Sequence, residues 1–559
     1  MSIERIKARS RHLRGTLVES LEDPLTGAIA EDDTQLSKFH GVYQQDDRDV
    51  RNERKRQRLE PAYSFMIRAR VPGGLCTTRQ WLNMDEIART RANGTIRLTT
   101  RQAFQLHGVI KGGLRPAIRD INQAMMDTLA ACGDVNRNVM CSPMPPVSEL
   151  HRQVQEHAES LSELLTPATG AYHEIWLDGR KLPDTGAEVE PIYGDTYLPR
   201  KFKTAFVVPP QNDVDVYAQD LGFIAITGNG SLLGFNVTVG GGMGMSHGET
   251  QTYPRLADVL GFCTADEVNA VAEAIVTTQR DYGDRGNRKH ARLKYTIDDR
   301  GLDWFRTEVE RRLGWRLGEP RPFAFVGNGD LYGWQQSTDG RWHYTLFVQN
   351  GRIADIGERL LMTGLRRIAR LHKGDFRLTP NQNLIISNVS EVDRKRITGL
   401  LRVFRIENSQ HASLLRLHSM ACVAFPTCGL AMAESERYLP SLIDRIDERL
   451  DAHGIGNEAI TIRMTGCPNG CARPYIAEIG LVGKGPGHYN LYLGAGFAGE
   501  RLNSLYRENI DEQEIIESLD PLFARFGAER EDGERFGDFA VRIGAVAPVS
   551  AGRDFHDAA

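Results

Sequence analysis

The chain of 559 residues has little of several features that mark whole classes of protein. It contains 8 cysteines, which are too few to build a disulfide scaffold of this size. Its 69 basic and 73 acidic residues nearly cancel, so no overall excess of charge drives binding to a polyanion or an anionic membrane. No window approaches the roughly 20 apolar residues of a membrane span. Any anion that the chain handles must therefore be bound by a local cluster of cations.

Three segments lack the sequence features of a secretory signal, a nucleic-acid-binding segment and a nucleotide-binding turn, respectively. MSIERIKARSRHLRG at the N-terminus has no apolar run, so it is not a secretory signal; its arginines mildly resemble a transit peptide, but we favour an exposed helix. RDVRNERKRQRLEP (48–61) has interleaved acids and no aromatic residue, which favours a solvated helix over a nucleic-acid-binding segment. VGGGMG (239–244) lacks the glycine spacing of a nucleotide-binding turn. We find no dinucleotide or flavin module in the sequence.

The composition, with 41% hydrophobic and 25% charged residues, is typical of a globular protein, and the length suggests about three to five domains. Strand-like and helix-like patterns alternate, which predicts a mixed α and β architecture. The predicted strands include 203–208, 232–239, 343–348 and 459–464. The predicted helices include 115–131, 265–279, 430–452 and 511–523. Apolar residues of the 430–452 segment recur on one helical face, which we expect to pack in a core.

Two pairs of segments repeat along the chain in the same order. IARTRANGTIRLTTRQAFQLHGV (87–109) reappears as IARLHKGDFRLTPNQNLIISNV (368–389), aligned on Arg97 and Arg377. LGFIA and GFNVTVGGGMG reappear as IGLVG and HYNLYLGAGFAG, aligned on Asn236 and Asn490. A long period with two copies does not make a solenoid. It predicts a duplication, with two similar halves packed around a pseudo-twofold axis and a site between them.

Four of the cysteines crowd into the last quarter of the chain, in the pattern C-x5-C followed by C-x3-C. They are Cys422, Cys428, Cys467 and Cys471. This spacing favours a 4Fe-4S cluster, because structural zinc prefers shorter gaps within a pair; zinc and unrelated buried thiols are the alternatives. The second pair lies in TGCPNGCARP, whose glycines and prolines let the backbone approach a cofactor closely. We expect core packing for the remaining cysteines, Cys76, Cys132, Cys141 and Cys263.

The cysteine segments carry a specific family resemblance. SMACVAFPTCGLAMAESERYLP (419–440), together with TGCPNGCARP, resembles the siroheme and 4Fe-4S signature of the sulfite and nitrite reductase family. The similarity extends over nearly the whole chain, from FHGVYQQDDRDVR (39–51) to FGDFAVRIG (536–544). Within the family it is greatest to the hemoprotein (beta) subunits of the assimilatory, NADPH-dependent branch. Gly133 and Gly429 are small departures from the family pattern, and neither removes a ligand.

The resemblance implies an α+β fold, a three-domain siroheme reductase architecture with internal duplication and the cofactors at the domain junction. The expected divisions are an N-terminal arm (1–65), a split ferredoxin-like domain (66–129 and 331–405), a first repeat domain (130–330) and a second repeat domain (406–559). It also implies that the second repeat domain carries the cluster. We take these divisions as approximate because segment ends are the least reliable part of such a prediction.

The chemistry that the family carries out is the six-electron reduction of sulfite to hydrogen sulfide, in sulfur assimilation and cysteine biosynthesis. The cofactors implied are siroheme and a 4Fe-4S cluster. By position, Cys471 is the thiolate that joins the cluster to the siroheme iron, and Cys422, Cys428 and Cys467 complete the cluster. Asn469 and the neighbouring amides are candidates for tuning its potential, and simple turn formation is the alternative role.

Sulfite and the siroheme carboxylates both demand cations, and RLTTR, NRN and PRKFK supply them locally. If Lys201 and Lys203 lie on a strand, they share one face. The resemblance places Arg68, Arg137, Lys201 and Lys203 around the substrate, with the arginines as anion clamps and the lysines as proton donors. It gives siroheme contacts to Arg97, Arg101, Gln105 and His107, and we add Arg200 to this set. Alignment spacing selects Arg68 over Arg70.

Because no flavin or nicotinamide module is present, the electrons must come from another protein, either a flavoprotein (alpha) reductase subunit that oxidises NADPH or a ferredoxin. Siroheme nitrite reductase is the alternative activity, and Lys203 favours sulfite because nitrite reductases of the family tend to replace that lysine. A zinc-stabilised or cluster-stabilised binding protein and a nucleic-acid binder are alternatives from other classes. We expect a cytoplasmic protein with no nucleic-acid or membrane partner.

Overall fold

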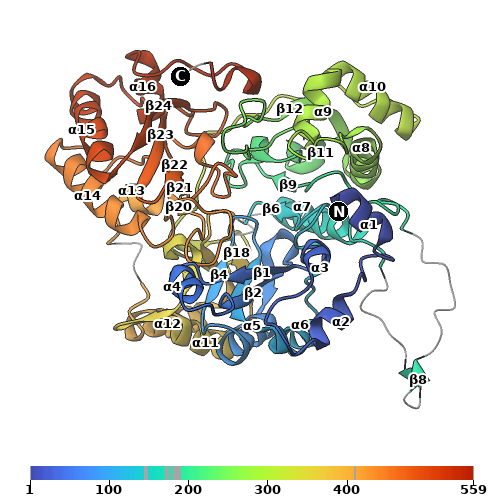
Figure 1. The fold of residues 1–559 in the computed structure, drawn as a ribbon. Coiled ribbons are helices and arrows are strands. Elements are labelled where there is room, and N and C mark those ends of the chain that lie inside the picture. The colour runs from blue at the N-terminus through green and yellow to red at the C-terminus, as the bar shows by residue number, and fades with distance from the viewer. Residues whose placement is uncertain are drawn as a thin grey trace.

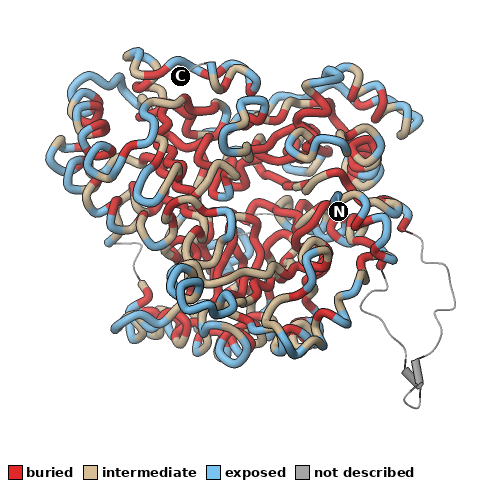
Figure 2. Tube along the Cα trace, in the orientation of Figure 1, coloured by how far each residue is buried: buried red, intermediate tan, exposed pale blue. Residues whose placement is uncertain are grey.

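The computed structural model describes residues 2–143, 149–169, 176–177, 180–181, 190–407 and 411–557. Figure 1 shows three bodies that meet at a common junction: a lower one in blue and yellow, an upper one in green, and an upper one in orange and red. Buried backbone runs through each body and through the junction (Figure 2). Across these residues, no helix is both long enough and apolar enough to cross a membrane.

The lower body consists of two five-stranded sheets that exchange a strand. The first sheet has the order β1-β2-β5-β4-β15 and the second has the order β13-β14-β19-β18-β3. The strands are Val42–Asp46 (β1), Tyr63–Ala69 (β2), Leu75–Thr77 (β3), Ile96–Leu98 (β4), Phe104–Val109 (β5), Gly333–Gln336 (β13), Trp342–Leu346 (β14), Arg352–Ile353 (β15), Asp375–Leu378 (β18) and Leu384–Val389 (β19). Each half therefore lends one strand, β3 or β15, to the sheet of the other.

Helices pack on these sheets and share one apolar core. They are Thr78–Arg91 (α5), Leu114–Gln123 (α6), Leu361–Leu371 (α11) and Glu391–Val403 (α12). The core contains residues of both halves, including Trp81, Leu98, Leu365 and Phe376. Because the two halves bury their apolar surfaces against each other, they form a single folded body despite their separation in the sequence.

The two upper bodies repeat the same sheet topology. The first contains Met140–Cys141 (β6), Thr204–Val207 (β9), Leu221–Gly228 (β10), Ser231–Val239 (β11) and Asp258–Thr264 (β12). The second contains Ser419–Ala421 (β20), Ile462–Thr465 (β21), Ile479–Gly485 (β22), His488–Leu493 (β23) and Ser504–Ile510 (β24). In both, three parallel strands are followed by two antiparallel ones. Ile224 pairs with Asn236 as Val482 pairs with Asn490, which confirms the predicted duplication.

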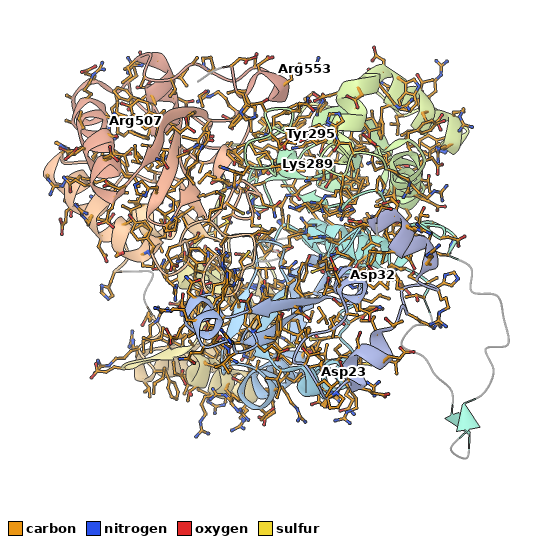
Figure 3. The ribbon with its side chains drawn as sticks, viewed as in Figure 1. Asp23, Asp32, Lys289, Tyr295, Arg507 and Arg553 are labelled. Atoms are coloured by element: carbon orange, nitrogen blue, oxygen red, sulfur yellow. The ribbon has the colours of Figure 1, made fainter. Side chains whose placement is uncertain are left out.

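Helices cover these sheets and give each body its own core. The first body has Glu149–Leu164 (α7), Val268–Tyr282 (α8), Leu293–Arg300 (α9) and Leu302–Leu313 (α10). The second has Leu414–Leu417 (α13), Leu439–Ala452 (α14), Glu512–Glu529 (α15) and Phe536–Arg542 (α16). Four short strands of two residues each complete the fold. They are Trp176–Leu177 (β7), Arg180–Lys181 (β8), Asp355–Ile356 (β16) and Arg359–Leu360 (β17). Side chains fill the space between the bodies (Figure 3). The α+β fold class is confirmed.

An N-terminal arm lies against the lower and green bodies, with helices Ile3–Arg9 (α1), Leu17–Glu22 (α2), Glu31–Leu36 (α3) and Arg51–Arg56 (α4). Helix α4 buries none of its residues, as predicted for the charged run. The prediction for α1 was partly wrong, because Ile6 and Lys7 on one of its faces are buried. Its charged composition conceals this buried face, since Lys7 is an inward-facing cation.

The predicted strands are present, and three predicted helices have clearly different bounds; the helix predicted over 511–523 continues to Glu529 as α15. Helix α6 ends at Gln123, and the exposed Met125 that follows has a left-handed φ of 59°. Helix α14 begins only at Leu439, with Pro440 in its first turn. The preceding residues Met432 and Ala433 instead donate their amides to Gly466 O, at 2.7 and 3.1 Å. These hydrogen bonds tie the segment to the residue before Cys467, so its amides are not available for a helix.

Candidate functional site

The four clustered cysteines follow the ends of neighbouring parallel strands. Cys422 comes directly after β20, and Cys467 comes after β21 with one glycine between. Because the carboxyl ends of parallel strands meet at one edge of a sheet, the two cysteine segments lie together. The amide of Gly466 donates to Cys422 Sγ at 3.3 Å, which joins them directly.

Glycine is required at two points of the second cysteine segment. A Cβ on Gly466 would lie 2.6 Å from Ala433 O, so the first cysteine segment can pack only against a bare backbone. Gly470 has a φ of 63°, and a Cβ there would lie 2.8 Å from Met243 O. Gly466 thus allows close approach of the 430–433 region, and Gly470 allows close approach of the 239–245 region.

The thiols act on one another electrostatically. Burial raises the pKa of Cys422 to about 12, and Cys471 is the next cause. Burial followed by Cys471 also raises the pKa of Cys428 and of Cys467. Three partly buried thiols thus share Cys471 as a neighbour, and a bound metal group would stabilise their thiolates.

The cysteine side chains do not form a ready-made site for a single metal ion. Across the part of the chain that the structure describes, no three His, Cys, Asp or Glu side chains form a group that could hold one metal ion. The C-x5-C and C-x3-C spacing in the sequence is what favours a 4Fe-4S cluster over zinc.

A row of polar side chains crosses the first sheet of the lower body. In register, Arg68 on β2 lies opposite Gln105 on β5, Gln105 lies opposite Arg97 on β4, and Arg97 lies opposite Arg352 on β15. Arg68 Nη2 donates to Gln105 Oε1 at 3.3 Å. His107 lies two residues along β5 on the same face. Strand pairing thus brings together four of the residues selected from the sequence and adds Arg352.

Two arginines selected from the sequence are bound mainly to protein groups. Arg97 Nε contacts Glu436 at 2.9 Å, and its Nη2 donates to Ala421 O at 2.8 Å. Arg352 contacts the same carboxylate at 2.6 Å. Arg101 donates to the Gln219 side chain at 2.8 Å and to two backbone carbonyls. Arg97 and Arg101 therefore anchor the lower body to the segments around them.

Arg68 and Arg137 meet at Cys132. Arg68 Nη1 donates to Cys132 Sγ at 3.1 Å, so this buried thiol has a polar partner as well as a place in the core. Arg137 Nη2 donates to the carbonyl of Gly133, whose φ of 91° explains the glycine there. The neighbouring Arg70 binds Asp127 and Thr166 instead.

Lys201 and Lys203 flank the buried Phe202 on an extended segment that leads into β9. Their alternation places both on one face, as predicted. Lys201 Nζ donates to Asn469 Oδ1 at 3.1 Å. The pKa of Lys201 lies well below its ordinary value, mainly because the residue is buried and secondly because Arg200 is near. The pKa of Lys203 is also lowered well below its ordinary value, mainly by burial and secondly by the charge of Lys201. Burial and the neighbouring Arg288 lower the pKa of Arg200 to about 10.

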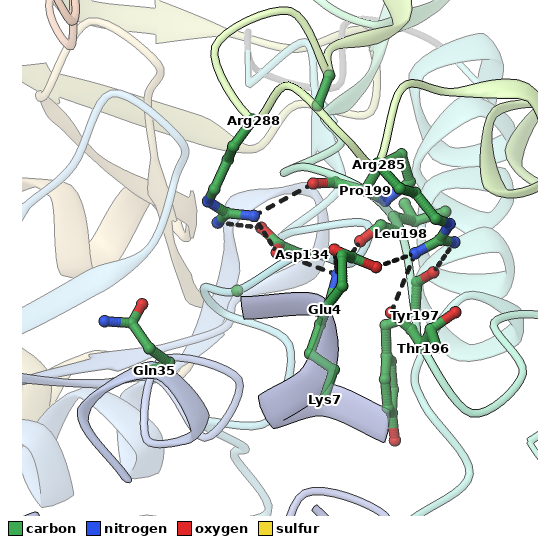
Figure 4. Close-up of polar contacts among 12 residues, drawn as sticks. Glu4, Lys7, Gln35, Asp134, Thr196, Tyr197, Leu198, Pro199, Arg285 and Arg288 are labelled. Carbon is green, nitrogen blue, oxygen red and sulfur yellow. Dashed lines mark hydrogen bonds and ion pairs between the residues drawn. The ribbon is translucent and has the colours of Figure 1, made fainter. Parts of the chain in front are cut away.

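The N-terminal arm holds the segment that precedes these lysines (Figure 4). Lys7 Nζ donates to Leu198 O at 2.8 Å and lies 3.5 Å from Asp134. Arg288 binds Asp134 at 2.7 Å and Pro199 O at 3.2 Å. The buried Lys7 of α1 and the half-buried Arg288 thus fix residues 198 and 199 from two sides.

Several buried donors at this junction have no acceptor. Arg68 Nε, Arg101 Nε, Arg137 Nε and His107 Nε2 are buried without a hydrogen-bond partner. An unsatisfied buried donor costs about 1 to 3 kcal/mol, more when charged, so this set favours the binding of a group that supplies acceptors, such as an anion. A carboxylate-rich cofactor and a small oxyanion fit this donor set, and the four thiols beside it fit an iron–sulfur cluster.

The glycine-rich 239–244 segment has a structural role in this site. Met245 N donates to Pro468 O at 3.0 Å, and a Cβ on Gly244 would lie 3.1 Å from Asn469 O. The fully buried Lys294 binds the carbonyls of Gly242 and Gly244, at 3.1 and 2.8 Å, beside Tyr295, which Figure 3 labels. The glycines therefore provide a surface for the cysteine loop.

Sequence reasoning missed Arg352, Glu436 and Cys132. Arg352 lies in the site because β15 pairs with β4 of the other half, and no local sequence motif predicts this pairing. Glu436 lies in the AESERYLP part of the first cysteine segment, between other polar residues, so its charge did not stand out. Cys132 was assigned to core packing alone.

Comparison with known proteins identifies the class. Residues 57–124 and 334–403 match the nitrite/sulfite reductase ferredoxin-like half domain, and residues 157–317 match the nitrite and sulphite reductase 4Fe-4S domain. The latter match covers the first repeat, whereas the clustered cysteines lie in the second. The chain belongs to the nitrite and sulfite reductase family.

The similar proteins include several bearing one name, sulfite reductase (NADPH) hemoprotein beta-component. That of Shouchella clausii is 60% identical over 556 residues, covering 99% of this chain and 97% of the relative. That of Geobacillus kaustophilus is 59% identical over 558 residues, with the same coverage. Among solved structures, the Mycobacterium tuberculosis NirA protein has a TM-score of 0.76 at 25% identity, covering 96% of this chain and 95% of that one.

Proposed function

We propose that the chain reduces sulfite to hydrogen sulfide as the hemoprotein component of an assimilatory, NADPH-dependent sulfite reductase. The observation that carries the proposal is the cluster of buried arginine and histidine nitrogens without partners, on segments that contact the cysteine loop through Thr100 and Lys201. The sulfite reductase name shared by relatives at 57–60% identity supports it.

The cofactors are siroheme and a 4Fe-4S cluster. Cys422, Cys428, Cys467 and Cys471 would hold the cluster, and Cys471, the exposed member, would also reach the siroheme iron. Gln105, His107 and Arg200, with the free nitrogen of Arg101, would face the siroheme carboxylates. When bound, the two groups supply electrons one at a time to the sulfur atom, which a side chain cannot do.

The protein's own residues supply charge and protons. Sulfite, six electrons and eight protons give hydrogen sulfide and three waters. Arg68 and Arg137 would fix the sulfite oxygens, since a planar guanidinium suits an oxyanion. Lys201 and Lys203 would give protons to the oxygens that leave as water. Their lowered pKa makes them stronger acids than ordinary lysines, which favours this transfer.

We propose that a separate flavoprotein subunit oxidises NADPH and passes the electrons to the cluster. The relatives are named as the beta-component of an NADPH enzyme, and this sequence has no nicotinamide or flavin module of its own. The alternative donor, ferredoxin, has no support from those names. Free thiols that must hold iron need a reducing compartment, which favours the cytoplasm.

The test is an anaerobic assay of the holoprotein with a chemically reduced dye as electron donor. We expect sulfide to form from sulfite, with kcat/KM higher for sulfite than for nitrite. Higher kcat/KM for nitrite, with ammonia as the product, would instead establish the nitrite reductase alternative. Analysis of the same sample should find iron rather than zinc.

A further inference from the structure

Arg473 lies two residues after Cys471 and begins the short 3-10 helix Pro474–Ile476, with a left-handed φ of 54°. Asp215 holds the same position in the first repeat, where it begins Val216–Ala218 with a φ of 48°. Both side chains are buried. Arg473 Nε contacts Asp215 Oδ2 at 2.5 Å, so equivalent positions of the two repeats have become an acid and a base bound to each other.

The rest of the Arg473 guanidinium binds both halves of the lower body. Nη1 donates to Thr100 O at 2.9 Å, and Nη2 donates to Pro380 O at 3.0 Å. Thr100 and Pro380 are themselves equivalent, because each lies three residues after the aligned Arg97 or Arg377. One side chain of the second repeat therefore contacts the first repeat and both ferredoxin-like halves.

The same turn also holds the backbone of Cys471. Thr100 Oγ1 donates to Cys471 O at 3.0 Å. The loop from Cys471 to Arg473 is thus fixed to Thr100 at both ends. The Thr100 side chain binds the backbone of Cys471, and the Arg473 side chain binds the backbone of Thr100. We propose that Arg473 is a positioning residue that sets the place of the Cys471 sulfur relative to the lower body, and that Thr100 assists it.

Arginine suits this task better than lysine. The three contacts lie in different directions, and a planar guanidinium presents its donors in a fixed fork. A lysine in its place has one nitrogen and cannot reach all three partners. A sulfur that joins two redox groups must be held accurately, since a displacement of about 1 Å can slow a reaction roughly 100-fold.

The inference rests on the proposed function, and the test compares matched variants of the holoprotein. Arg473→Lys cannot keep all three contacts. Arg473 shares the carboxylate of Asp215 with Arg463. Arg366→Lys is the control, because Arg366 likewise shares a buried carboxylate, Asp85, with a second arginine but lies on α11 away from the cysteines. Thr100→Val is a milder variant that removes only the hydroxyl on Cys471 O.

For Arg473→Lys we expect kcat to fall about 10- to 100-fold, with KM for sulfite within about twofold of the parent, because Arg68 and Arg137 are untouched. In the cofactor-free protein, amide hydrogen exchange should quicken in residues 467–473 and stay unchanged in the rest of the second repeat. Thr100→Val should shift the same readouts in the same direction by a smaller factor, and Arg366→Lys should not.

Parent-like kcat and loop exchange in both Arg473→Lys and Thr100→Val would overturn the inference. Faster exchange throughout the second repeat, rather than in the loop, would also overturn it by showing a general structural role. If Arg473→Lys does not fold, Thr100→Val decides alone. Failure of the proposed function would appear separately, as a parent protein that does not reduce sulfite.

Discussion

Lys201 Nζ lies 3.1 Å from Asn469 Oδ1, which joins the basic segment of the first repeat to the cysteine loop of the second. The two residues are far apart in sequence, and each lies where its own repeat faces the junction. A predicted proton donor is therefore held against the loop that carries Cys467 and Cys471. Protons and electrons would reach the substrate from adjacent groups.

Replacing either lysine should remove a proton donor without unfolding the chain. We expect Lys201→Met or Lys203→Met to lower kcat for sulfite about 100-fold or more, the usual contribution of a positioned acid. The matched control is Lys289→Met, because Lys289 is an exposed lysine paired with Glu249. Steady-state assays with a reduced dye measure the effect, and parent-like rates in both lysine variants would contradict their assigned role.

The same lysines should give the cofactor-free protein a distinctive pH dependence. Their pKa in the folded chain lies well below the ordinary 10.5, so the unfolded chain binds more protons between those two values. Stability should therefore rise as pH rises within that window. Urea unfolding at successive pH values below 10.5 should show this slope in the parent and a smaller slope in a Lys201→Met, Lys203→Met double variant. Equal slopes would contradict the lowered pKa values.

Removing a clustered cysteine should remove the metal group. We expect Cys422→Ser to lose iron and siroheme together, because the two groups share the site. Cys263→Ala is the control, since Cys263 is buried in the core of the first repeat. Iron and siroheme per chain are the readouts. A Cys422→Ser protein that keeps its full iron content would show that Cys422 is not a ligand.

Glu436→Gln should destabilise the junction. Burial alone raises the pKa of Glu436, but Arg97 and Arg352 outweigh it and hold that pKa below its ordinary value. Removing one partner of a buried ion pair costs about 3 to 5 kcal/mol. The exposed Glu358, paired with Arg405, is the control, and Glu358→Gln should cost less than about 1 kcal/mol. Similar unfolding free energies for the two variants would contradict the importance of the buried group.

The depressed pKa of Glu436 also sets the direction of its pH dependence. Its contribution to stability is present above the ordinary carboxyl pKa and is lost as pH falls through the lower folded-state value. The difference in unfolding free energy between the parent and Glu436→Gln should therefore shrink at acid pH. A difference that grows on acidification would contradict the ion pairing.

Lys7→Met should loosen the segment that precedes Lys201 and Lys203. It removes the donor to Leu198 O and leaves Asp134 to Arg288 alone. We expect faster amide exchange in residues 196–199 and little change on Arg5→Met, because Arg5 is exposed. If exchange in this segment is unaffected by Lys7→Met, the arm does not hold it.

The sequence was sufficient to predict those parts of the fold and site that depend on residues close together along the chain. The cysteine spacing located the thiol group, the two aligned segment pairs indicated the duplication, and period-two alternation put Lys201 and Lys203 on one face. These features depend on neighbours along the chain. The same is true of the charged helix α4, which has no buried residue.

The sequence was insufficient where a residue acts across the junction. Arg352 reaches the site through a strand lent to the other half, and Arg473 binds partners in three other units. Lys7 has the composition of a surface residue and is 1% exposed. The predicted helix 430–452 begins only at Leu439, because the amides of Met432 and Ala433 bind Gly466 O instead. Tertiary contacts override local propensity at each of these places.

The visible absorption spectrum of the purified protein, recorded before and after chemical reduction and then with sulfite, tests the central claim most directly. The account predicts a reduced-porphyrin spectrum that changes when sulfite is added, and the change should be weakened in Arg68→Met. A protein that stays colourless even when produced with ample siroheme and iron would contradict the account and point to a structural role for the four cysteines.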